Sequence, residues 1–179
     1  MKGAIFIALN EMIEREYGMG AWLDLLDKAN SNGVYTSTKH YPDEELFEIV
    51  GHFCDRYQIE LPNALRVFGD FLFHFLHKAH PVFADSKPDF FSFIGSIDGV
   101  IHVEVHKLDE NAKPPRITLE SIEGNRAVLN YFSERKLCYL AEGLLTGAAA
   151  HYGLKIEIEQ TRCMHDGAES CEFNLVCLS

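Results

Sequence analysis

The sequence lacks a long hydrophobic run. No stretch approaches the ~18 consecutive apolar residues that a membrane-spanning helix needs. The short apolar run from Ile5 to Leu9 soon meets Asn10 and Glu11, and no small-residue cleavage site follows it. We therefore expect neither a signal peptide nor a membrane anchor, and we expect a cytoplasmic location.

Basic residues are also scarce. The chain has 16 Lys and Arg against 27 Asp and Glu, which gives a formal net charge of -11. This charge repels phosphate backbones, and the basic residues are dispersed along the chain, so binding to nucleic acid or to an anionic membrane is not expected. Proteins and small molecules are the favoured partners.

Internal repeats and low-complexity linkers are absent as well. The 179 residues, of which 47% are hydrophobic, are enough for one sizeable core or at most two small lobes. The five cysteines are an odd number in a chain without an export signal. They therefore favour thiols or metal ligands over a disulfide framework.

Up to residue 107, apolar residues recur at the spacing of amphipathic helices. Gly18 ends the first of these helices, and Pro42 and Pro62 mark the starts of later ones. The Pro114-Pro115 pair ends helical structure. The predicted helices cover residues 2–17, 21–29, a segment from 43, a longer segment from 62, and 90–107.

From Arg116 onward the period changes to two, which is typical of strands. The predicted strands cover residues 116–120, 126–131, 154–159 and 171–177, and a long helix is predicted at 134–152. The fold class is therefore α+β, in a single domain over residues 1–179. We expect a helical N-terminal lobe at 1–60 and a second lobe at 61–179 that carries a four-stranded antiparallel sheet and the long helix.

Two separated signals carry chemistry. His102 lies on an apolar helix, and Tyr131, Ser133 and Arg135 alternate in an extended segment, where two hydroxyls and a guanidinium can face one anionic ligand. An imidazole and a carboxylate clamp are what a haem needs, because its iron takes an axial base and its two propionates take polar partners. Each signal also has an ordinary explanation. A histidine on an apolar helix is more often a packed residue, and Ser133 could cap the helix that follows.

Together with their surroundings, these residues resemble the haem nitric oxide/oxygen binding (H-NOX) family, which includes the haem domain of soluble guanylate cyclase. The resemblance covers nearly the whole chain. It rests on Met1-Lys2-Gly3, the His102 helix, Pro114-Pro115, Tyr131-x-Ser133-x-Arg135 and Ala141-Glu142-Gly143-Leu144-Leu145.

The resemblance implies that haem b lies between the two lobes. His102 would be the proximal iron ligand, and Tyr131, Ser133 and Arg135 would hold the propionates. Pro115 would press on the porphyrin edge. For the apolar residues that would enclose the macrocycle, ordinary core packing is the alternative; these are Ile5, Leu9, Leu140 and Leu144.

Leu140 decides which gas is expected. Family members that hold oxygen have a tyrosine at this position, whose hydroxyl stabilises bound dioxygen. Tyr139 is rotated by about 100° around the helix and should point elsewhere. The resemblance therefore implies a nitric oxide sensor that excludes oxygen and also binds carbon monoxide. His74 could reach the pocket, although we favour a packed helix residue.

The mechanism implied by the resemblance is release of His102 from the iron, followed by movement of its helix. The sequence shows no catalytic machinery, so we expect a sensor and not an enzyme. Its effector would be a separate histidine kinase or cyclic-di-GMP enzyme. The alternative is a haem-free module that binds a small molecule or senses zinc or redox state.

A second constellation combines Cys138, Cys163 and Cys171, which together with one imidazole would form a tetrahedral zinc site. Some bacterial H-NOX proteins have such a site, with a histidine at the position that is Gln160 here. His165 is the nearest substitute. The alternative is that the cysteines are small buried residues on strand faces.

Overall fold

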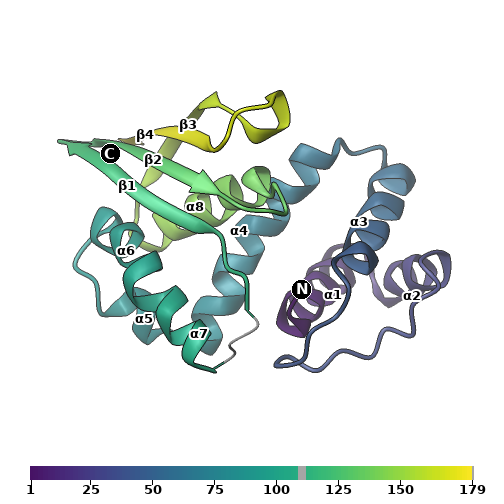
Figure 1. Ribbon diagram of the computed structural model, residues 1–179. Helices are drawn as coiled ribbons and strands as arrows, with labels where there is room; N and C mark the ends of the chain where they lie inside the picture. Colours follow the sequence, from purple (N-terminus) through teal and green to yellow (C-terminus); the bar gives the residue numbers. More distant parts are fainter. Residues whose placement is uncertain (109–111, 179) are drawn as a thin grey trace.

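The computed structural model describes residues 1–108 and 112–178. The predicted N-terminal helices are confirmed, with end points that differ by a few residues. They are α1 (Gly3–Tyr17), α2 (Met19–Lys28), α3 (Asp43–Tyr57) and α4 (Leu61–Ala79). In Figure 1, α1, α2 and α3 are grouped on one side of α4, and the sheet lies on the other side.

The N-terminal helices bury a first hydrophobic cluster, to which α4 also contributes. Its fully buried members include Phe6, Ile13, Leu25, Ile49 and Phe68. Apolar residues three and four apart fall on one face of a helix, and burial of these faces holds the helices together. Each such side chain contributes about 1.5–3 kcal/mol when it is fully removed from water.

The segment that carries His102 differs from the single helix predicted over 90–107. After α5 (Val82–Asp85), the chain forms α6 (Phe90–Ser96), the π-helical segment η1 (Ile97–His102) and α7 (Val103–Leu108). A π-helix has a wider turn than an α-helix and often occurs at functional sites. The apolar spacing gave no sign of this change, and His102 is the last residue of the wider turn.

The four predicted strands are confirmed and form one antiparallel sheet in the order β1-β2-β4-β3. Alternate residues of β2 and β4 point to the buried face, and helix α8 packs there (Figure 1). The second hydrophobic cluster fills this layer, with Leu129, Phe173 and Leu175 fully buried. The strands are β1 (Arg116–Glu123), β2 (Arg126–Phe132), β3 (Lys155–Arg162) and β4 (Cys171–Leu178).

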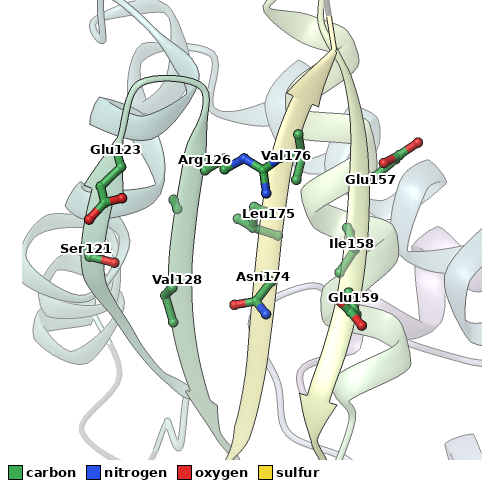
Figure 2. Close-up of a pocket in the computed structure, with 11 residues that line it drawn as sticks. Ser121, Glu123, Arg126, Val128, Glu157, Ile158, Glu159, Asn174, Leu175 and Val176 are labelled. Carbon is green, nitrogen blue, oxygen red and sulfur yellow. The ribbon is translucent and has the colours of Figure 1, made fainter.

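The opposite face of the sheet is polar and hollowed. Figure 2 shows the side chain of Arg126 reaching from β2 toward β4, with Glu123, Glu157 and Glu159 on the two edge strands. Because side chains alternate along a strand, these residues point away from the buried face, and their neighbours along each strand point into it.

Helix α8 (Cys138–His151) begins four residues later than the predicted helix at 134–152. The chain first makes a turn in which the Lys136 amide donates to the Ser133 carbonyl, and Lys136 has a φ of 50°. Helix α8 then crosses α4 closely at Gly69 and Gly143. A Cβ atom at Gly143 would lie 2.0 Å from the carbonyl oxygen of Arg66, so the crossing requires glycine.

The two hydrophobic clusters meet on α8. Leu144 and Tyr139 pack against both clusters. Within the described residues, no helix has the length and hydrophobicity needed to cross a membrane.

Candidate functional site

His102 is held by a carboxylate that sequence reasoning missed. Its Nδ1 lies 2.7 Å from Asp98 Oδ1, and the other carboxylate oxygen accepts the backbone N–H of Ile117 at 2.8 Å. Because a carboxylate only accepts hydrogen bonds, the proton of a neutral His102 lies on Nδ1 and the lone pair on Nε2. A histidine that ligates a metal usually has such an outer partner, which fixes the ring and raises its basicity.

The strands connect this pair to the proposed carboxylate clamp. Ile117 lies in β1 directly opposite Tyr131 in β2. Asp98 therefore joins the end of η1 to the strand pair that carries the first clamp residue.

Tyr131 and Ser133 are brought together as the sequence predicted. Both are buried, and the Tyr131 hydroxyl interacts with the Ser133 side chain and with the backbone of Leu137. Burial raises the pKa of Tyr131 to about 12, although the hydrogen bond with Ser133 opposes this effect. Tyr131 therefore stays a neutral hydroxyl donor at any physiological pH.

Arg135 follows in the turn and is also adjacent, since its backbone N–H donates to Ser133 Oγ at 3.2 Å. Ser133 thus stabilises this turn and does not cap α8, whose N-cap residue is Leu137. The guanidinium is oriented by two contacts, from Nε to Asp43 Oδ2 and from Nη1 to the Lys113 carbonyl at 2.8 Å. These contacts use two of its five N–H donors.

Asp43 is a second carboxylate whose role the sequence did not indicate beyond the start of a helix. Its other oxygen accepts from the amino group of Met1. Burial alone would raise the pKa of Asp43, but hydrogen bonds from this amino group and from Arg135 outweigh burial and hold the pKa below its ordinary value. Asp43 therefore remains ionised and ties α3 to the clamp.

The apolar residues predicted to enclose a macrocycle come from two helices. Leu9 and Leu140 are buried in the first cluster, and Ile5 and Leu144 are half-buried against it. Ile101 of η1 is half-buried against the second cluster.

Pro115 is half-buried directly before β1. His74 lies on the exposed face of α4, shared with Val67 and Lys78, and its nearest charged partner is Asp70 at 4.0 Å. This corrects the expectation that His74 lines the pocket, and equally the alternative that it is packed. Helical spacing alone did not show which side of α4 is solvated.

The three cysteines are brought together. The Sγ atoms of Cys138, Cys163 and Cys171 lie within 4.8 Å of one another, and those of Cys138 and Cys163 are 3.9 Å apart. All three side chains are buried. Burial raises the pKa of Cys138 to about 12 and also raises that of Cys171. Without a bound cation Cys138 and Cys171 are therefore thiols.

His165 does not join this cluster, which corrects its assignment as the substitute ligand. Its Nε2 lies 2.9 Å from the Lys136 carbonyl oxygen, and its ring stacks on Tyr139. Gln160 lies beside the thiols, next to Cys138. Its amide nitrogen is buried and has no hydrogen-bond partner among the described residues.

The residues present fit a haem. The site provides an imidazole with an oriented ring, half-buried apolar side chains on α1, η1 and α8, and a cluster of two buried hydroxyls and a guanidinium. An iron porphyrin needs an axial base, an apolar enclosure and partners for its carboxylates.

The comparisons with known proteins agree with this chemistry. A family model described as Haem-NO-binding matches residues 2–160. The chain is 39% identical to an H-NOX protein from S. oneidensis crystallised in the Fe(II)NO state, with 100% of each chain covered and a TM-score of 0.94. It is 34% identical to the H-NOX from Shewanella woodyi solved in the Fe(II)CO state, which covers 98% of this chain and 94% of that one, with a TM-score of 0.85.

An H-NOX protein from K. algicida at 23% identity shares the fold, with a TM-score of 0.90 over 100% of this chain and 97% of that one. No curated protein matches the chain at a significant level. H-NOX domains bind haem and gas ligands and are sensor domains, not enzymes. The family match and the full-length similarity show that this chain belongs to the H-NOX family.

Proposed function

We propose that this chain is a cytoplasmic, haem-based nitric oxide sensor that excludes oxygen and regulates a separate signalling protein. The observation that carries the gas assignment is Leu140, which is buried among apolar side chains and offers no hydrogen-bond donor. Bound haem b would supply the iron that takes up the gas. The Shewanella relatives were solved with nitric oxide and carbon monoxide on ferrous iron, which supports the same ligands here.

Tyr139 does not compensate for Leu140. Its ring stacks on His165 with a centroid separation of 5.5 Å and lies under the guanidinium of Arg66. An iron-bound dioxygen has superoxide character and depends on a hydrogen-bond donor, whereas nitric oxide binds ferrous iron strongly without one.

In the proposed site, His102 is the proximal ligand, and Tyr131, Ser133 and Arg135 hold the propionates. Ile5, Leu9, Leu144 and Pro115 would line the pocket. Asp43 and Lys113 already orient the Arg135 side chain, so little side-chain entropy would be lost when it binds a propionate carboxylate.

The proposed signal is the release of His102 from the iron when nitric oxide binds. Asp98 accepts hydrogen bonds from His102 Nδ1 and from the amide of Ile117, and it would keep hold of both when the ring is free of the iron. A displacement of His102 therefore acts on η1 and on β1 together. The changed surface would alter the output of a histidine kinase or a cyclic-di-GMP enzyme.

An absorption spectrum of the purified protein tests the sensor proposal. We expect a haem band in the ferrous protein, a five-coordinate spectrum with nitric oxide and no stable complex in air. Absence of a haem band would favour the alternative, a haem-free module that binds another carboxylate. A stable oxygen complex would refute the argument from Leu140.

A matched pair of arginine variants tests the clamp. Arg135→Gln removes the guanidinium and should speed haem loss to apomyoglobin, while Arg116→Gln removes an exposed arginine of β1 and should not. Equal rates of haem loss in the two variants would show that Arg135 does not hold a propionate.

We also propose that Cys138, Cys163 and Cys171 bind zinc. Ligand sulfurs at 2.3 Å from a tetrahedral zinc lie about 3.8 Å apart, and Cys138 and Cys163 are already separated by 3.9 Å. Zinc bound to thiolates would offset the raised pKa values, and oxidation of the cysteines would release it. Native mass spectrometry without zinc, together with thiol accessibility that a chelator leaves unchanged, would reject this second site.

A further inference from the structure

A second polar cluster lies at the far end of the α4–α8 pair. His77 is in the last turn of α4, His151 is the last residue of α8, and Asp85 is the last residue of α5. Asp85 Oδ1 lies 2.7 Å from His77 Nε2 and 3.3 Å from His151 Nε2. All three ligand atoms lie within 4.8 Å of one another.

We propose that His77, Asp85 and His151 form a binding site for a divalent transition-metal ion such as Zn²⁺. Two imidazoles and one carboxylate are a set of ligands that binds this class of ion, and water can complete the coordination. The site shares no residue with the haem pocket or with the cysteine cluster.

The distances agree with this assignment. Nitrogen and oxygen ligands at about 2.1 Å from a tetrahedral zinc lie about 3.4 Å apart. The separation of His151 from Asp85 already has this value within 0.1 Å, at 3.3 Å. The separation of His77 from Asp85 has to open by less than 1 Å, which a rotation of the Asp85 side chain can supply because it is 52% exposed.

The ring positions are set by packing. The two imidazoles have centroids 4.3 Å apart, and His77 stacks on Phe73 with an interplanar angle of 5°. The Tyr152 hydroxyl donates to the Ala84 carbonyl at 2.8 Å, which holds the end of α5 beside the end of α8. The site is thus built from fixed elements and is not a chance meeting of flexible side chains.

Electrostatics also favour a cation here. The carboxyl ends of α4 and α8 carry the negative ends of their helix dipoles, and they converge at this cluster with the charge of Asp85. The two imidazoles are 24% and 22% exposed. An ion can therefore reach them from solvent.

A bound ion would clip the ends of α4 and α8 together. These helices cross closely at Gly69 and Gly143, near the middle of each helix, so the clip would fix the pair at a second point toward their carboxyl ends. Metal binding to the folded state alone also stabilises that state.

Zinc titration of the chelator-stripped ferrous carbonyl holoprotein, labelled with ¹⁵N-histidine, tests the proposal. We expect ring-nitrogen resonances of His77 and His151 to shift at micromolar zinc, while those of His74 and His80 stay in place. Unmoved resonances of His77 and His151, or shifts that require millimolar zinc, would overturn it. This titration needs no variants except those used to assign the histidine resonances.

The zinc affinities of histidine variants provide a second, independent test of the site. His77→Gln and His151→Gln should each lose about tenfold or more in affinity, and the matched control His74→Gln, an exposed histidine of the same helix, should lose none. Haem absorption of each variant reports that it is folded. Equal affinities in His77→Gln and His74→Gln would refute the site, and any zinc held by the cysteines adds the same background to all variants.

Discussion

Replacement of Asp98 by asparagine tests the connection between His102 and the strands. In the native chain the two carboxylate oxygens have separate partners, the His102 ring and the Ile117 amide. An asparagine side chain has one acceptor oxygen, so it can satisfy only one of these two donors. The variant is nearly isosteric and isolates this loss from any change in packing.

The expected cost follows from the contacts that are lost. A hydrogen bond to a charged group contributes about 1.5–3 kcal/mol, and a neutral one contributes about half as much. The His102 and Asp98 side chains are 17% and 33% exposed, so we take the lower part of the range, roughly 1.5 kcal/mol. This equals about tenfold in an equilibrium constant.

Two measurements check this value. Haem transfer to apomyoglobin should be about tenfold faster in Asp98→Asn, in line with the loss that outer-partner mutations cause at metal sites. The iron–histidine stretching frequency in resonance Raman spectra should fall, because a less basic imidazole binds iron more weakly. Glu104→Gln removes one negative charge from the adjacent helix, where Glu104 pairs with Lys107 on the surface, and is the control.

A stretching frequency and haem transfer rate equal to those of the native protein would refute the reasoning. The same holds if Glu104→Gln reproduces the effect, since the loss would then come from net charge and not from the contact with His102.

Three further outcomes follow from the structure. Leu140→Tyr should allow an oxygen complex in air, read from the absorption spectrum, because it places a hydroxyl at a buried apolar position; an unchanged spectrum counts against the gas assignment. Gly143→Ala should lower the free energy of unfolding by about 3 kcal/mol or more, since its Cβ meets a backbone oxygen; the exposed Gly20→Ala should be near neutral. In denaturant titrations the metal-free protein should lose stability between pH 9 and 12. Burial raises the pKa of Cys138 from 9.0 to about 12 in the folded state, so over this range the thiol ionises only in the unfolded state and favours unfolding. Cys138→Ser should lose less stability over the same range.

The sequence predicted the fold wherever one periodicity continued across a whole element. The period of two in the four strands and the helical period in α1 and α4 match the structure, because each of these elements has one buried face. It was less informative at the Ser133–Leu137 turn and at η1, where hydrogen bonds and not hydrophobic spacing determine the backbone.

The candidate site shows a similar division. The sequence indicated the clamp because Tyr131, Ser133 and Arg135 alternate at short spacing, and it indicated the cysteine cluster through the resemblance to the H-NOX family. It assigned His165 to the thiols because the two are near in sequence, whereas the structure directs that ring to the Lys136 carbonyl. The direction in which a side chain points depends on the conformation of the intervening turn, and spacing along the sequence does not determine it.

The two carboxylates that the sequence did not assign have similar structural roles in the site. Asp98 holds His102 and β1, and Asp43 holds Arg135 and the chain's amino group, so each fixes one proposed haem contact to a distant part of the backbone. Since Ile117 and Tyr131 are paired across β1 and β2, the proximal side and the clamp share one strand pair. Release of His102 would therefore act first on this strand pair, while the contacts of Asp43 would keep the clamp and α3 in place.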